Sequence, residues 1–144
     1  MLRKWTKPAL AGVLGLMTML LAYGGGATGQ DKKDKDDKLP DIAEIMKKGH
    51  AKSDGYIAKI KDASKDGKWE DANKYAKDFA ILGDALGKNK APKGDEKSWE
   101  KLTKKYADNT KLVLKGTEDK DVKAVNKGLG GINCMECHKE HKPK

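Results

Sequence analysis

The chain is 144 residues long, which is enough for one domain, and its formal net charge is +9. Arg3 is its single arginine, so almost all of the positive charge belongs to lysine, which lacks the planar fork that reads phosphates and base edges. The composition therefore argues against nucleic acid as a partner.

The N-terminal segment has the three parts of a secretory signal peptide. Three basic residues precede an apolar run at residues 8–22, and small residues follow at 23–29. The run is shorter than the roughly 18 to 20 residues that a membrane-spanning helix needs. We therefore expect residues 1–29 to be cleaved during export, which places the mature protein in the periplasm.

The mature chain begins with a charged segment. Residues 30–38 read QDKKDKDDK and contain no apolar side chain, so their composition predicts a disordered tether. The folded domain is then expected at residues 39–144. Without the signal peptide, 28 lysines face 22 acidic residues, and the net charge is +6.

Two helical patterns open the folded domain. Pro40 is a favoured first helical position, and apolar residues recur at helical spacing over residues 40–62. Residues 62–68 contain Ser, Asp and Gly and predict a turn. A second helix with a broad apolar face follows at 69–86.

Two further helical patterns complete the domain. Residues 87–95 predict a loop, with Asp95 available to cap a third helix that ends at Gly116. Thr117 to Asp121 supplies the cap and acids of a fourth helix, whose apolar spacing continues into Cys134. The pattern predicts an all-α fold, an antiparallel four-helix bundle whose interior can house a cofactor.

Aromatic side chains lie on the apolar faces of the expected helices. We assign them to core packing and give none a chemical role, because such stripes are ordinary in helical cores. They are Tyr56, Trp69, Tyr75, Phe79, Trp99 and Tyr106.

Cys134, Cys137 and His138 form the motif C-x-x-C-H six residues before the last residue of the chain. This is the attachment sequence of c-type haem. On a helix, the spacing puts both thiols and the imidazole on neighbouring faces of one turn, so one ring can meet all three. We expect Cys134 and Cys137 to form thioether bonds to haem c, and His138 to be the proximal iron ligand.

Three other uses of the two cysteines fit this sequence less well. A disulfide closing so small a loop would constrain little of the unfolded chain. A zinc site could add His141 as a fourth donor, but four donors on one and a half helical turns would strain a tetrahedral shell. A redox dithiol normally sits in a βαβ setting, which this helical sequence lacks. Haem is favoured because the motif and the export segment agree.

The second axial position of the iron must be filled from far upstream or stay open. Only six residues follow His138, and His141 is expected to stay on the proximal side. Met46 and His50 are the remaining donors, four residues apart on the first helix and facing the same way. Met46 is the first choice, and an open site and His50 are the alternatives. Without an iron-binding role, Met46 would be a methionine that fills a gap in the core, and His50 would be a partly exposed histidine on a helix.

The C-terminal stretch GTEDKDVKAVNKGLGGINCMECHKEHK resembles the last helix of the class II cytochromes c, the family of cytochrome c prime and its Met-ligated low-spin relatives. Gly131, three residues before the first cysteine, fits the family pattern. Lys142, four residues after the histidine, stands where members commonly have arginine, and His141 stands where they have an aromatic residue. In IAEIMKKG, Met46 falls at or near the position that ligates iron or covers an open site.

The resemblance implies a four-helix bundle with one covalent haem. We expect an electron carrier and not an enzyme, because no catalytic constellation is visible. Its lysine-rich surface would meet an acidic redox partner, soluble or membrane-bound. The alternative is a five-coordinate protein, similar to cytochrome c prime, that binds nitric oxide or carbon monoxide. Class II relatives often pair through their first helices, so the resemblance is also compatible with a homodimer.

Overall fold

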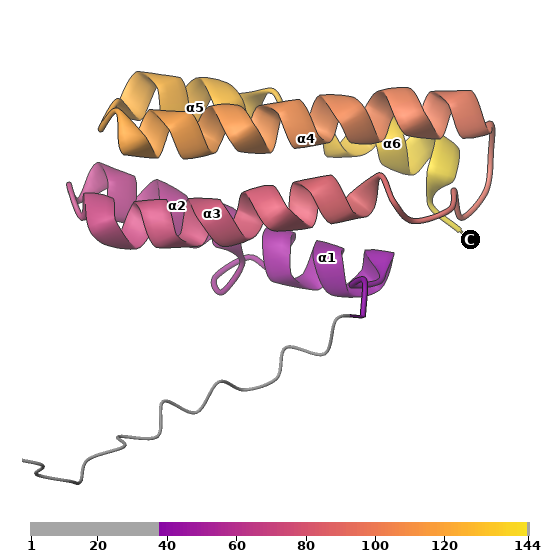
Figure 1. Cartoon of the computed structure of the whole chain (residues 1–144), viewed down its shortest axis with the longest axis horizontal. Coiled ribbons are helices and arrows are strands. Elements are labelled where there is room, and N and C mark those ends of the chain that lie inside the picture. The colour runs from indigo at the N-terminus through magenta and orange to yellow at the C-terminus, as the bar shows by residue number, and fades with distance from the viewer. Residues whose placement is uncertain (1–37, 144) are drawn as a thin grey trace, which may run out of the picture. The chain divides into compact units, whose positions relative to one another are not determined.

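The computed structural model describes residues 38–143, and this part of the chain is all helical, with no strand within it (Figure 1). Its helices are α1 (Ile42–His50), α2 (Tyr56–Lys65), α3 (Trp69–Leu86), α4 (Glu96–Glu118), α5 (Val122–Gly130) and α6 (Cys134–His141). The predicted all-α class is confirmed. The expected signal peptide at 1–29, and all of the expected tether except Lys38, lie outside the described residues.

The helices pack around a long central pair. α3 packs along α4, α2 packs on α3, and α5 packs on α4. Figure 1 shows α2 and α5 toward one end of this pair and α1 and α6 toward the other. None of the helices in residues 38–143 combines the length and the apolar character that crossing a bilayer requires.

The prediction of one continuous helix over 40–62 is wrong. α1 ends at His50 and α2 begins at Tyr56, with a tight turn between them. Ser, Asp and Gly at 53–55 favour such a turn. The Gly55 N–H donates to the Ala51 carbonyl at 3.1 Å, and a Cβ at Gly55 would lie 2.6 Å from the Ala51 backbone, so the turn needs glycine. The apolar spacing resumes at Tyr56, so the sequence pattern did not indicate the break between the two helices.

The expected fourth helix is also divided. α5 ends at Gly130 and α6 begins at Cys134, so the C-x-x-C-H motif has a short helix of its own. Asn133 caps that helix, because its side-chain oxygen accepts a hydrogen bond from the Glu136 N–H at 3.2 Å. The two glycines before Asn133 favour the interruption.

The predicted end of the third helix at Gly116 is wrong, whereas its start is confirmed. The Asp95 side chain caps α4 by accepting from the Ser98 N–H at 2.8 Å. α4 continues to Glu118, and Gly116 is buried where α5 crosses it. A Cβ at Gly116 would lie 2.7 Å from the Val125 backbone nitrogen, so this glycine serves close helix packing. The predicted helix at 69–86 is confirmed as α3.

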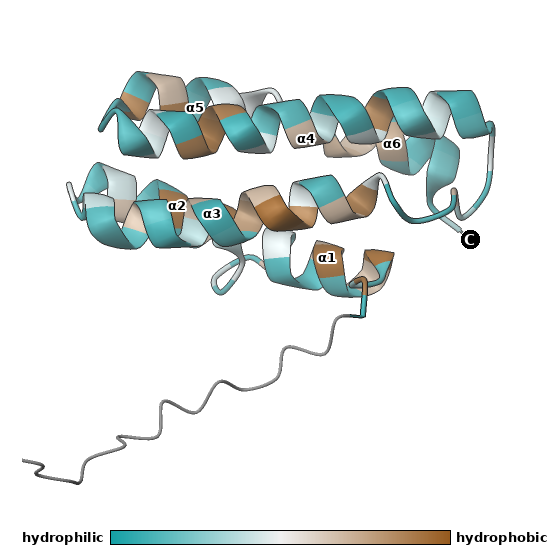
Figure 2. Ribbon diagram, in the orientation of Figure 1, coloured by the Kyte–Doolittle hydropathy of each residue, from teal (hydrophilic) through white to brown (hydrophobic). Residues whose placement is uncertain are grey.

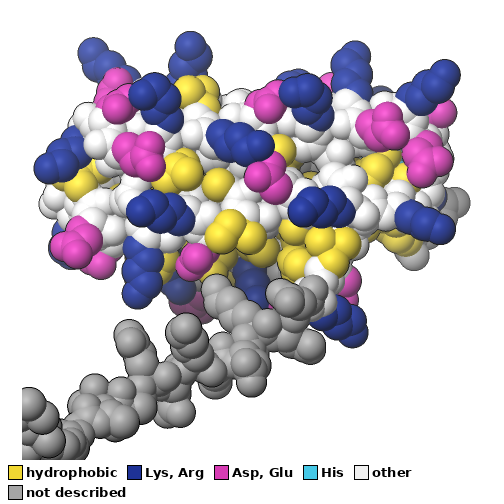
Figure 3. Space-filling model, in the orientation of Figure 1, with side chains coloured by type: hydrophobic (Ala, Val, Ile, Leu, Met, Phe, Trp, Pro, Cys, Tyr) yellow, Lys and Arg dark blue, Asp and Glu magenta, His cyan; other side chains and the backbone are white. Residues whose placement is uncertain are grey.

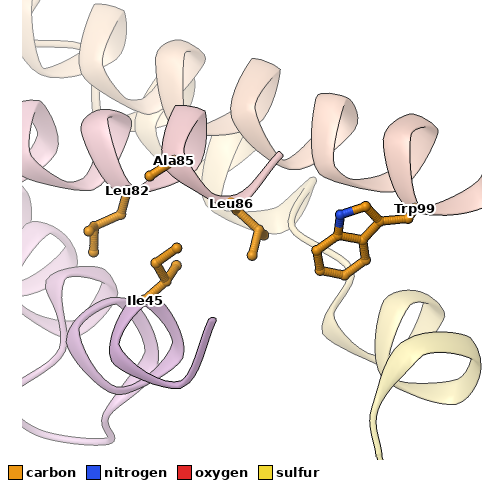
Figure 4. Packing of buried hydrophobic residues seen from close by; sticks show 5 residues of the cluster. All are labelled: Ile45, Leu82, Ala85, Leu86 and Trp99. Carbon is orange, nitrogen blue, oxygen red and sulfur yellow. The ribbon is translucent and has the colours of Figure 1, made fainter. Parts of the chain in front are cut away.

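The buried side chains form two clusters. The cluster near α1 consists of Ile45, Leu82, Ala85, Leu86 and Trp99. Figure 4 shows Ile45 pointing from α1 toward Leu82 and Leu86 on α3, with the Trp99 indole beyond Leu86. The cluster between α2 and α5 consists of Ile60, Ala76, Phe79, Val113 and Val125. The prediction that aromatic residues serve packing is confirmed for Phe79 and Trp99, which are both buried.

The surface is predominantly charged. Lysines alternate with acidic side chains on the face shown in Figure 3, and hydrophilic residues cover most of the ribbon in Figure 2. The second half of α3 is the most hydrophobic stretch in that view. Ion pairs such as Lys111 with Asp84 join exposed side chains, so they contribute little to stability.

Close packing of α4 on α5 predicts opposite outcomes for two neighbouring glycines. A Cβ at Gly128 would lie 2.7 Å from Val113 Cγ2 and 2.9 Å from the Val113 backbone nitrogen. Gly128→Ala should therefore lower the free energy of unfolding by roughly 1 to 3 kcal/mol. Gly130→Ala is the matched control, because a Cβ there meets nothing within 4 Å and alanine favours helix. Urea denaturation of both variants checks this, and equal stabilities would contradict it.

Candidate functional site

A cavity of about 750 Å³ opens between α1 and α6. Its walls are predominantly apolar, and its volume is in the range of roughly 300 to 1,000 Å³ that small-molecule and cofactor sites occupy. α1 contributes Met46 and His50, and α6 contributes Cys134, Cys137 and His138. The structure therefore brings together every residue that the sequence nominated for the site, from both ends of the folded chain.

The helix packing explains why this end is open. α2 and α5 pack against each other, whereas α1 packs mainly on α2 and α3, and α6 packs on α4. Between residues 38 and 143, α1 and α6 are not a closely packed pair. The space that remains is bounded by side chains such as Leu86, Trp99, Leu102 and Tyr106.

The two cysteines are free thiols in different surroundings. Cys134 is exposed, whereas Cys137 is half-buried and packs against the Ile45 cluster. Burial raises the pKa of the Cys137 thiol, and the nearby Glu140 carboxylate raises it further. A redox-active dithiol needs a lowered thiol pKa, so this environment does not favour that chemistry.

His138 and Met46 line the cavity from two different helices, α6 and α1. His138 is exposed on α6, one residue after Cys137, and its imidazole is not held in any hydrogen bond that the structure records in residues 38–143. Met46 is half-buried and packs against the Ile45 cluster that Cys137 also contacts. A thioether and an imidazole are both ordinary axial donors to haem iron.

His50 is held by a neighbour. Its Nε2 lies 2.9 Å from the Tyr106 hydroxyl, and its ring meets the edge of Phe79 with centroids 6.1 Å apart. Burial lowers the pKa of His50, and the electrostatic influence of His138 lowers it further. His50 is therefore a neutral imidazole near pH 7, with one ring nitrogen already engaged.

His141 does not face the site as a free donor. The residue is 2% exposed, Nδ1 donates to the Lys93 carbonyl at 2.7 Å, and Nε2 lies 3.3 Å from Ser98 Oγ. The ring also meets Trp99 edge-on, with centroids 5.2 Å apart. Both nitrogens are occupied, which disfavours the four-donor zinc site. Within residues 38–143 no three His, Cys, Asp or Glu side chains gather as a metal site.

The residues that the sequence did not nominate are Tyr106 and the partners of His141. Tyr106 was assigned to packing alone, yet it lines the cavity and contacts His50, which lies 56 residues earlier. Ser98 and His141 are 43 residues apart. No local pattern predicts contacts over such separations. The apolar face of α4 was the one signal in the sequence that these α4 residues point inward. That signal does not distinguish a residue of the core from a residue of the site.

The residues present fit a haem by the chemistry of their donors. Two thiols and an imidazole lie on α6, a methionine lies on α1, and all four side chains line the same predominantly apolar cavity. Comparison of the chain with protein-family models, with curated proteins and with solved structures finds no match. Its function must therefore be inferred from the residues of this site.

The buried contacts of His141 predict a stability effect. His141→Ala leaves the Lys93 carbonyl without its donor and opens a void beside Trp99, so we expect a loss of roughly 2 to 4 kcal/mol in the free energy of unfolding. Lys139→Ala on the same helix is exposed and should change it by less than about 0.5 kcal/mol. Denaturant titration measures both, and similar losses for the two variants would contradict the anchoring role.

Proposed function

We propose that the chain is an exported, periplasmic c-type cytochrome that carries electrons through one covalently attached haem. One observation carries the proposal: a single apolar cavity receives the C-x-x-C-H motif from α6 and two candidate iron ligands from α1. A haem supplies one-electron chemistry at its iron when bound. The export part of the proposal rests on the sequence of residues 1–29.

Each residue of the motif has a separate task in this proposal. Cys134 and Cys137 attach the ring by thioether bonds, and their spacing on α6 holds both sulfurs on one side of the helix. His138 is the proximal ligand and is free to turn toward the iron. The apolar walls exclude water, and burial is one of the factors that set a reduction potential.

Met46 is the proposed ligand on the opposite side. It lines the cavity without a competing polar contact, whereas the Nε2 of His50 is engaged with Tyr106. A methionine opposite a histidine raises the reduction potential of haem iron, which suits a carrier. If Met46 only covers the iron, the alternative is a five-coordinate protein that binds nitric oxide or carbon monoxide.

We further propose that the six helices form a four-helix bundle of the class II cytochrome c kind. In this arrangement α3 and α4 are two of the four bundle helices. The third is α1 followed by α2, and the fourth is α5 followed by α6, each interrupted by a turn. The packing of α2 against α5 supports this arrangement. These two helices close one end of the bundle, whereas α1 and α6 are not closely packed at the other end.

A transient, acidic redox partner fits the surface near the motif. Lys142 is exposed and lines the cavity, Lys139 is exposed on α6, and the exposed Lys105 pairs with Glu136. Exposed lysines attract an acidic protein over a distance and raise the rate of encounter more than the affinity.

Absorption spectra of the purified, exported protein test the function. We expect c-type haem bands in both oxidation states, and little change when carbon monoxide is added to the reduced protein. Ready uptake of carbon monoxide would support the gas-binding alternative in place of the carrier. Spectra without haem bands would remove both.

Loss of the Met46 thioether should change the iron environment specifically. In Met46→Ala the ligand-to-metal band near the red edge of the oxidised spectrum should disappear, the reduction potential should fall, and the reduced protein should gain affinity for carbon monoxide.

Met135→Ala is the matched control for Met46→Ala. Met135 lies between the two cysteines but is 74% exposed, so its removal should leave that band unchanged. A band that persists in Met46→Ala would show that Met46 is not the ligand.

A further inference from the structure

Two side chains on α1 could reach the same position on the iron. Met46 and His50 are one helical turn apart, and both line the cavity. Imidazole is as ordinary an axial donor as a thioether, so the chemistry of the donors does not decide between them. Something else in the protein must decide which of them binds.

The Tyr106 hydroxyl contacts the nitrogen of His50 that has the longer reach. Nε2 is the ring nitrogen farther from the backbone, and it lies 2.9 Å from that hydroxyl. Burial raises the pKa of Tyr106, so the phenol stays protonated, and burial lowers the pKa of His50. Either the phenol donates to the Nε2 lone pair, or an Nε2–H donates to the phenol oxygen. In both tautomers Nε2 is engaged with the phenol, and a metal would have to displace this hydrogen bond.

Packing holds the two rings in this arrangement. Phe79 meets His50 and Tyr106 edge-on, with centroid distances of 6.1 and 5.9 Å. A Cβ at Gly49 would lie 3.2 Å from Phe79 and 3.4 Å from the Tyr106 oxygen, so α1 approaches this aromatic pair closely. The His50 imidazole, which extends from α1, is therefore held in place by Phe79 on α3 and Tyr106 on α4.

We propose that Tyr106 is a positioning residue that holds His50 away from the iron and thereby assigns the sixth ligand position to Met46. This inference rests on the proposed haem attachment. Tyr106 acts here through His50 and does not itself bind the iron.

Tyr106→Phe tests the proposal, because it keeps the ring and removes only the hydroxyl. Loss of one ordinary hydrogen bond should raise the ratio of His-ligated to Met-ligated iron by about 2- to 10-fold. We expect the methionine band to weaken, the reduction potential to fall, and the electron paramagnetic resonance spectrum to show a bis-imidazole form. The double variant Tyr106→Phe/His50→Ala should restore the methionine band.

The Met46→Ala variant is a second background, in which even a small fraction of His50-ligated iron can be detected. In Met46→Ala the sixth position is without its thioether, and adding Tyr106→Phe should convert high-spin iron to a low-spin bis-imidazole form. The affinity of the reduced protein for carbon monoxide should fall by about 2- to 10-fold in that step, and His50→Ala should reverse it. An unchanged spectrum and affinity in this background would overturn the proposal.

The controls separate this inference from the function on which it rests. Tyr56→Phe also removes one half-buried tyrosine hydroxyl, bonded to Asp78 at 3.4 Å, but Tyr56 does not line the cavity, so its spectra should match the parent. Intact mass is measured for every variant. A parent without haem would overturn the proposed function and this inference together, whereas haem with identical spectra in all Tyr106 variants would overturn this inference alone.

Discussion

Apolar walls contributed by the two ends of the folded chain bound a cavity at one end of the helical core. α2 and α5 close their end of the core against each other, while α1 and α6 bound a cavity of about 750 Å³. Apolar side chains that line a cavity open to solvent stay in contact with water, which is less favourable than burial. In the proposed holoprotein, a flat apolar ring in this space would bury those side chains, so binding of the cofactor would also complete the core.

The short helix α6 is anchored at both ends. At its start Asn133 caps the helix, and Asn109 donates to the Gly131 carbonyl at 3.2 Å. At its end His141 is buried against α4 and the preceding loop. Cys134 and His138 lie between these anchors and remain exposed. This arrangement sets the position of the motif and leaves its reactive atoms accessible for covalent attachment.

Local signals in the sequence predicted the parts of this structure that depend on local physics. The apolar period of α3, the Asp95 cap and the C-x-x-C-H spacing are each readable within one or two helical turns. The breaks after His50 and before Cys134 were missed because apolar spacing resumes on the far side of each turn. Gly116 was read as a helix terminator, but its role is close contact with Val125, which only the tertiary structure reveals.

The contacts of Tyr106 and His141 could not have been predicted in the same way. Each joins segments more than forty residues apart, and a half-buried tyrosine on a helical face is ordinary packing in most proteins. Met46 and His50 were nominated because so few donors remain in the sequence. Met46 and His50 line the same cavity as the residues of α6 because α1 packs on α3 and α6 packs on α4.

The central claim is that Cys134 and Cys137 hold a haem covalently in the cavity between α1 and α6. Intact-mass measurement on protein exported by a host that matures c-type cytochromes tests it most directly, with the Cys134→Ala/Cys137→Ala double variant prepared alongside. The parent should carry the added mass of one haem that survives denaturation, and the double variant should carry none. A parent recovered as bare polypeptide would contradict the claim.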